Sequence, residues 1–181
     1  TKAQKERVMA TLTAAYFVGE ITIPNISGSS ITETANLFGL QVLIAKYEPI
    51  YLKWLLGEDF YTDYVAGLAE SSPEARWTTL RDKIFVVDSV LEIGTSPAAN
   101  YVYCQWLKTN NSITSTNGEF KPSAENMTSF TMREKYVTAY NEMVRMSLEI
   151  QDWLLYDVLE DYPELDTDSL GVFETINSWG I

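Results

Sequence analysis

The sequence predicts a mainly α fold: a helical bundle of five or six helices with one long C-terminal helix and a small β-hairpin. Three observations lead to this prediction. Apolar residues recur at alternating steps of three and four along several segments, which is the period of a helix with one buried face. Serine–proline pairs, which are typical of helix starts, occur at 72–73 and 96–97. An Asn-Gly pair at 117–118 has the chemistry of a tight hairpin turn.

The length and composition of the chain fit a single domain. A length of 181 residues with 46% hydrophobic residues allows a substantial core. We expect an N-terminal arm or helix at 1–19, a helical core at 20–159 and an acidic C-terminal segment at 160–181. Within the first part, residues 3–18 have the pattern of an amphipathic helix. The β-branched residues at 20–26 predict a short extended segment.

The first strong helix signal is a capping box, in which Ser30 and Glu33 have the required spacing. The helix that follows is expected to end near residue 47, because Pro49 lacks a backbone N–H and restricts the residue before it. Two shorter helices are expected next, at 50–56 and 60–68.

The two serine–proline pairs each predict a further helix. After Ser72-Pro73 a continuous apolar stripe predicts a helix to about residue 92, formed by Trp77, Leu80, Ile84, Val87 and Leu91. After Ser96-Pro97 the next helix is expected at 98–108.

A polar stretch then holds the predicted β-hairpin, at about 112–121 around Asn117 and Gly118. An isolated two-stranded hairpin is marginally stable in water. Its apolar residues, Ile113 and Phe120, are therefore expected to pack on another surface, in this chain or in a neighbouring one.

The long C-terminal helix is predicted from about residue 131 to 159. Thr131 and Glu134 form a second capping box, and a helix of this length measures roughly 40 Å. Its buried stripe consists of Tyr136, Tyr140, Met143, Ser147, Ile150, Leu154 and Val158.

Composition excludes several kinds of chemistry. The chain has no histidine, so neither Ser-His-Asp nor Cys-His catalysis nor a histidine metal site is possible. Cys104, the only cysteine, lies in an apolar run and is expected in the core. An acidic run from Asp166 begins like a calcium loop, but Leu170 and Asn177 stand where ligands are required. We expect no catalytic residue, cofactor or metal.

Negative charge accumulates at the C-terminal end. The formal net charge is −12, and no lysine or arginine follows Arg145, which disfavours tight binding of nucleic acid. Three carboxylates at helical spacing, Asp157, Glu160 and Asp161, form a solvated face, a partner-docking face, or a metal or catalytic site. Beyond them, the apolar residues Phe173 and Trp179 either fold back on the core or reach a partner.

Neither a leader peptide nor a membrane span is expected. The N-terminal residues are polar and charged, and no run of about 18 apolar residues occurs. The sequence therefore predicts synthesis in a reducing cytoplasm and no contact with a membrane.

Three sequence segments resemble a known family. These are residues 46–61, residues 96–103 with the polar 109–114 and Asn117-Gly118, and residues 135–144. In this order they are similar to head–tail connector (neck adaptor, or ring) proteins of tailed phages, in the form found in phages and prophages of gut Bacteroidetes. The resemblance covers about residues 20–155 and leaves the acidic end outside.

The resemblance implies a structural protein of the virion, made in the cytoplasm of the bacterial host. Such proteins form homo-oligomeric rings, commonly dodecamers, at the head–tail junction. The expected partners are further copies of the chain, the portal protein and tail or neck proteins. DNA would pass through the ring without being bound specifically.

The candidate interface follows from the hairpin and the acidic end, and consists of Ile113, Asn117, Gly118, Phe120, Asp157, Glu160, Asp161, Phe173 and Trp179. Two other functions remain open from the sequence. One is a cytoplasmic helical regulator or binding module that acts as a monomer or dimer. The other is an enzyme that uses carboxylates.

Overall fold

A computed structural model describes residues 11–110, 113–115, 118–120 and 132–177 of the chain. Five α-helices and two antiparallel two-stranded hairpins make up its regular elements within these residues, which confirms the mainly α prediction. The helices are α2 (Ile31–Leu56), α3 (Glu58–Leu68), α4 (Ala75–Ile84), α5 (Pro97–Asn110) and α6 (Met132–Tyr156). The strands are β1 (Val86–Asp88), β2 (Ile93–Thr95), β3 (Ile113–Ser115) and β4 (Gly118–Phe120). None of the described helices is long and apolar enough to cross a membrane.

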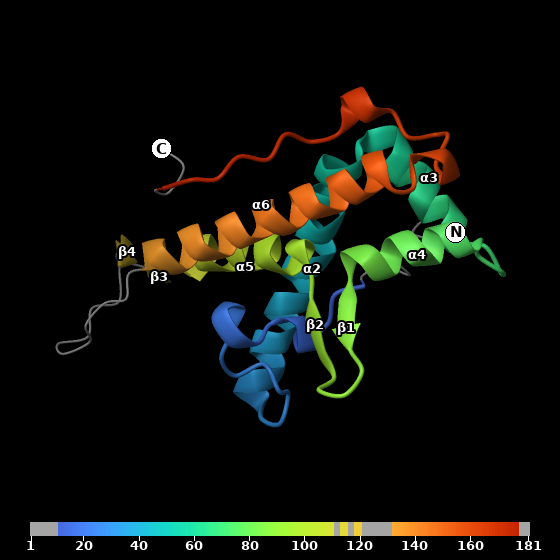
Figure 1. Cartoon of the computed structure of the whole chain (residues 1–181). Helices are drawn as coiled ribbons and strands as arrows, with labels where there is room; N and C mark the ends of the chain where they lie inside the picture. Colours follow the sequence, from blue (N-terminus) through green and yellow to red (C-terminus); the bar gives the residue numbers. More distant parts are fainter. Residues whose placement is uncertain (1–10, 111–112, 116–117, 121–131, 178–181) are drawn as a thin grey trace.

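The centre of the fold is α5, which packs against both α6 and α2. Helices α5 and α6 lie side by side and run in opposite directions, while α2 crosses them (Figure 1). Val102 of α5 and Met143 of α6 are fully buried between these helices. The hydroxyls of Tyr51 and Ser147 form a buried hydrogen bond of 2.7 Å that links α2 to α6. The predicted stripe of α6 therefore faces the core.

Helix α2 begins as predicted but continues further. Its first turn is capped by Ser30, whose hydroxyl accepts a hydrogen bond from the Glu33 N–H at 3.2 Å. The expected break at Pro49 is wrong, because α2 continues through Pro49 to Leu56 and ends only at Gly57. Proline leaves the carbonyl of the residue four positions earlier without its helical donor. That residue, Ala45, is exposed, so water can satisfy its carbonyl.

Helix α4 is shorter than predicted. The expected helix to residue 92 ends at Ile84, and residues 86–95 form the β1–β2 hairpin instead. The Asp88 carboxylate accepts hydrogen bonds from the backbone N–H groups of Val90 and Leu91 at 2.8 and 2.9 Å. Because this carboxylate stabilises the turn locally, the chain reverses where the apolar period alone would continue a helix.

The N-terminal expectations are also corrected. Residues 14–16 and 19–21 form single turns of 3₁₀ helix, so neither the described end of the 3–18 helix nor the extended segment at 20–26 is present as predicted. The predicted hairpin near 112–121 is present, with Ser115 paired to Gly118. Asn117 lies outside the described residues.

Beyond α6 the chain folds back. Helix α6 ends at Tyr156, before the predicted residue 159, and Leu159–Asp161 forms a 3₁₀ turn. The acidic segment then runs beside α6 towards the other end of the molecule (Figure 1). Asp157, Glu160 and Asp161 therefore do not share a helix face, which corrects the sequence prediction.

Candidate protein-interaction surface

The exposed side of α2 carries an apolar stripe over its first half. Its large members are Ile31 and Phe38, which are 92% and 67% exposed, together with the exposed Val42. Ala35 is also exposed and lies between them at spacings of four and three, so the four side chains share one helix face. We call Ile31, Ala35, Phe38 and Val42 the α2 face. Because α2 also buries Leu40 and Ile44 inward, it is apolar on two sides.

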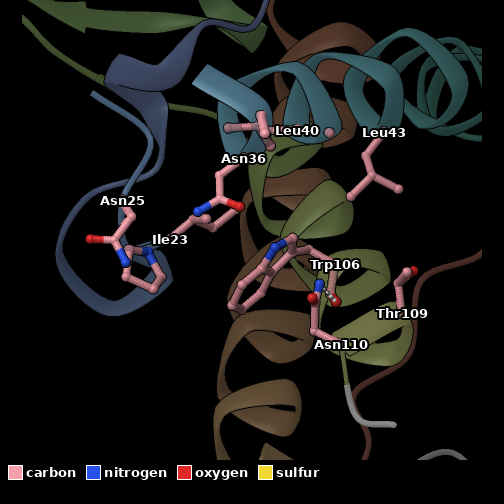
Figure 2. Close-up of a pocket in the computed structure, with 11 residues that line it drawn as sticks. Ile23, Asn25, Asn36, Leu40, Leu43, Trp106, Thr109 and Asn110 are labelled. Atoms are coloured by element: carbon pink, nitrogen blue, oxygen red, sulfur yellow. Dashed lines mark hydrogen bonds between the residues drawn. The ribbon is translucent and has the colours of Figure 1, made fainter. Parts of the chain in front are cut away.

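A groove runs along one side of this face. It has a volume of about 390 Å³ and is enclosed by α2, by the loop at 23–25 and by the end of α5. Figure 2 shows the Trp106 indole across from Asn36 and Leu43, with Ile23 and Asn25 closing one end. None of the described residues that line it is charged. A shallower hollow borders the α2 face through Ala35 and Phe38 on the other side.

The second apolar surface is the β1–β2 hairpin. Four large apolar residues are exposed on it, namely Val86, Val87, Val90 and Leu91, with Val90 86% exposed. We call these four residues the hairpin tip, a name that covers Val86 and Val87 on β1 as well as Val90 and Leu91 in the turn. Exposed apolar groups on adjacent positions of a protruding element are typical of contact surfaces.

Strand β2 of the hairpin is held against the turn at Ala14–Tyr16. A side chain at Gly94 would lie 2.4 Å from the Tyr16 ring, so only glycine allows this approach. Tyr16 and Phe85 also pack edge to face, with ring centroids 6.3 Å apart. The hairpin therefore presents its tip from a fixed position.

The acidic segment is docked by its apolar residues. Phe173 is only 6% exposed and lies against Trp54, with ring centroids 4.3 Å apart. Asn141 of α6 exchanges two hydrogen bonds with the backbone of Ile176, at 2.8 and 2.9 Å. Phe173, predicted as an interface residue, is thus part of the core of this chain.

Two sets of carboxylates near the C-terminal end differ in their partners. Glu164 makes a two-bond ion pair with Arg76, at 2.8 and 3.0 Å, and this pair lowers the pKa of Glu164. Asp157, Glu160 and Asp161 are exposed, and no ion pair involves their carboxylates within the part of the chain that the structure describes. This second group is a solvated acidic surface in the protomer.

The remaining predicted residues lie in the β3–β4 hairpin or beyond the described segments. Ile113 begins β3, while Gly118 and Phe120 lie at the two ends of β4. Asn117 and Trp179 lie outside the described residues. Among the described members of this set, Phe173 is buried in the core, whereas Asp157, Glu160 and Asp161 are exposed.

One buried charge was missed by the sequence analysis. Glu48 is only 1% exposed, and its two carboxylate oxygens accept hydrogen bonds from the backbone N–H groups of Thr11 and Leu12 at 2.8 and 3.1 Å. Burial raises the pKa of Glu48 to about 7, although these hydrogen bonds act in the opposite direction. Its position beside Pro49 inside a helix gave no sequence signal for this role.

The single thiol belongs to the core, as predicted. Cys104 is buried, and burial raises its pKa to about 12, so the thiolate nucleophile is disfavoured at neutral pH. Among the described residues, no group of three or more cysteines and carboxylates could hold a metal ion.

No protein-family model, curated protein or solved structure matches the chain.

Proposed function

We propose that this chain is a structural connector subunit that assembles with copies of itself into a ring at the phage head–tail junction. The observation that carries the proposal is that one protomer exposes two separate apolar surfaces, the α2 face and the hairpin tip. Exposed apolar surfaces of this kind mark protein contacts. In this proposal the chain acts by joining proteins and performs no catalysis.

Rings require a contact between two different surfaces of the protomer. A contact between identical surfaces closes as a dimer, whereas a contact between different surfaces continues to the next copy until a ring closes. The resemblance of residues 46–61 and 135–144 to connector proteins favours this kind of assembly. The portal protein and tail or neck proteins are the proposed partners above and below the ring.

The acidic surface has a place in the same proposal. Asp157, Glu160 and Asp161 are exposed, and a channel lined by such groups would let DNA pass because phosphate is repelled and no counterions are released by binding. We place these carboxylates towards the lumen. A ring structure with residues 157–168 on its outer rim would contradict this placement.

The test is assembly of the full chain. Native mass spectrometry and negative-stain electron microscopy of the purified protein, alone and with a phage portal protein, should show rings of a single copy number. A protein that remains a monomer or dimer in both conditions contradicts the proposal and favours the helical binding module. Turnover of a small molecule, or calorimetric binding of a divalent metal, would favour an enzyme instead.

A further inference from the structure

We propose that copies of this chain join head to tail, with the hairpin tip of one copy seated on the α2 face and groove of the next. This inference rests on the proposed function and specifies which surfaces make the ring contact. The occupant of the groove is thus a second copy of the chain.

Shape is the first argument. The turn between β1 and β2 protrudes from the molecule (Figure 1). The apolar side chains of the hairpin tip are exposed in the protomer. The α2 face borders a hollow on each side, and a side chain added at Gly39 in the groove would meet nothing within 4 Å. A protruding apolar element and a hollowed apolar surface on one chain are complementary between copies.

The hairpin does not fill the groove of its own chain. Its base packs on the turn at Ala14–Tyr16 through Gly94, and the α2 face remains exposed in the protomer. The two surfaces are therefore both available to neighbours. Contact between them is heterologous, which is the type of contact a ring requires.

Charge is the second argument. Copies with a formal net charge of −12 repel one another unless the contact is locally neutral or complementary. Residues 86–95 carry Asp88 and Glu92 and no cation, whereas Lys46 is the only charged residue of α2 between Glu33 and Glu48. Lys46 lies one turn beyond Val42, at the end of the α2 face. In the proposed contact, Asp88 and Glu92 of the hairpin therefore lie against a neutral surface that has one positive charge, Lys46, at its end.

Cross-linking of single-cysteine variants tests the contact. Phe38→Cys and Val90→Cys place thiols on the two surfaces at exposed positions, where the protomer fold should be unaffected. The native Cys104 is buried and should not react. The two purified variants are treated with a short bis-maleimide reagent, separately and as an equal mixture, and the linked peptides are identified by mass spectrometry.

The expected result is a 38–90 product in the mixture that exceeds each of the 38–38 and 90–90 products by about tenfold, which corresponds to about 1.4 kcal/mol of preference. If 38–38 or 90–90 products dominate while rings are still seen by electron microscopy, the inference is wrong and the proposed function stands. If no product forms and the protein remains monomeric alone and with the portal protein, both are wrong.

A charge swap provides an independent readout. Lys46→Glu should weaken self-association about two- to fivefold, in the range of an exposed ion pair, and adding Glu92→Lys should restore it. Lys108→Glu, on α5 beside Tyr136, is the matched control and should leave association unchanged. Equal losses for Lys46→Glu and Lys108→Glu, or no rescue by Glu92→Lys, would overturn the inference.

Discussion

The C-terminal segment and the first half of α2 use apolar residues in opposite ways. In the C-terminal segment, Leu165 and Phe173 are buried against helices of the same chain. In the first half of α2, Ile31 and Phe38 face solvent although α2 already has a buried side. The acidic end, which the sequence marks as a candidate docking segment, thus stabilises the protomer. The α2 face, in contrast, is apolar surface that no part of the described protomer covers.

The largest expected difference is between two phenylalanines. Phe173→Ala should lower the free energy of unfolding by about 3–5 kcal/mol, because a buried ring beside Trp54 is lost and leaves a cavity. Phe38→Ala should change it by no more than about 0.5 kcal/mol. Urea denaturation of both variants, compared by circular dichroism, measures the difference. Similar losses for the two variants would remove the contrast between the regions.

Two glycines give a second matched pair. A Cβ at Gly171 would lie 2.1 Å from the backbone oxygen of Trp54, so Gly171→Ala should cost about 2–3 kcal/mol through overpacking. Gly39→Ala should instead stabilise the protomer by about 0.5–1 kcal/mol, because alanine is the better helix former and nothing obstructs its methyl group.

Thermal unfolding of the two alanine variants measures both the expected loss of stability in Gly171→Ala and the expected gain in Gly39→Ala. A loss of stability in Gly39→Ala would show that the groove is not open in the free protomer. That result would contradict the head-to-tail contact, which requires free space in the groove.

Helix α2 shows the same contrast within one element. Its second half contains the buried Glu48, whereas its first half exposes the α2 face. Burial raises the pKa of Glu48 to about 7, above its ordinary value of 4.5. The folded protein therefore holds this proton more tightly than the unfolded chain does. The stabilisation from Glu48 is fully present below about pH 4.5 and is lost as the pH rises through about 7. Burial, and after it the charge of Glu48, raises the pKa of Tyr16 and of Tyr64.

Glu48→Gln should cost about 1–2 kcal/mol at low pH, because an amide offers one acceptor to the two N–H groups of Thr11 and Leu12. It should also remove the fall in stability between pH 4.5 and 7. Glu33→Gln is the opposite control, since hydrogen bonds from Ser27 and Ser29 lower the pKa of Glu33. Its contribution is present above the ordinary pKa and is lost as the pH falls. Denaturation curves that extend below the ordinary pKa of 4.5 and above pH 7 distinguish the two; an unchanged profile in Glu48→Gln would contradict the assignment.

The sequence predicted elements well where local signals and burial agree. Helices α3, α5 and α6 lie close to their predicted ranges, because each has one apolar stripe that is buried; in α5 the Ser96 cap points to the same structure. The prediction failed at α4, where Val87 and Leu91 continue the apolar period but are exposed. Periodicity cannot distinguish side chains that face a core from those that face solvent.

The candidate surface was mostly outside the reach of sequence analysis. A signal did exist in α2, since Ile31, Phe38 and Val42 form a second apolar face beside Leu40 and Ile44, and a helix that is apolar on two sides needs two coverings. The β-branched Val86 and Val87 before Asp88 also indicate a strand and turn. The burial of Phe173, in contrast, depends on tertiary packing against Trp54, which no local pattern specifies.

The smallest expected effect concerns the ion pair that ties the acidic segment to α4. Arg76 also donates to the Asp161 carbonyl at 3.0 Å and lies 4.4 Å from the centroid of Trp77, so Arg76→Ala removes more than one contact. A double-mutant cycle with Glu164→Ala isolates the pair. Because both side chains are partly exposed, the coupling should be about 0.5–1 kcal/mol and should decrease as salt is added.

The matched control for this cycle is the pair of Arg145 and Glu149, which lie four residues apart on α6 and hold no other segment. Both cycles should give similar coupling energies. Hydrogen exchange in residues 164–176, however, should increase only when Arg76 or Glu164 is changed, because of these two ion pairs only the first joins the C-terminal segment to another helix. If exchange there is unaffected, the ion pair does not help to hold the segment, and its docking depends on its other contacts, which include Phe173 with Trp54 and the hydrogen bonds from Asn141 and Gln151.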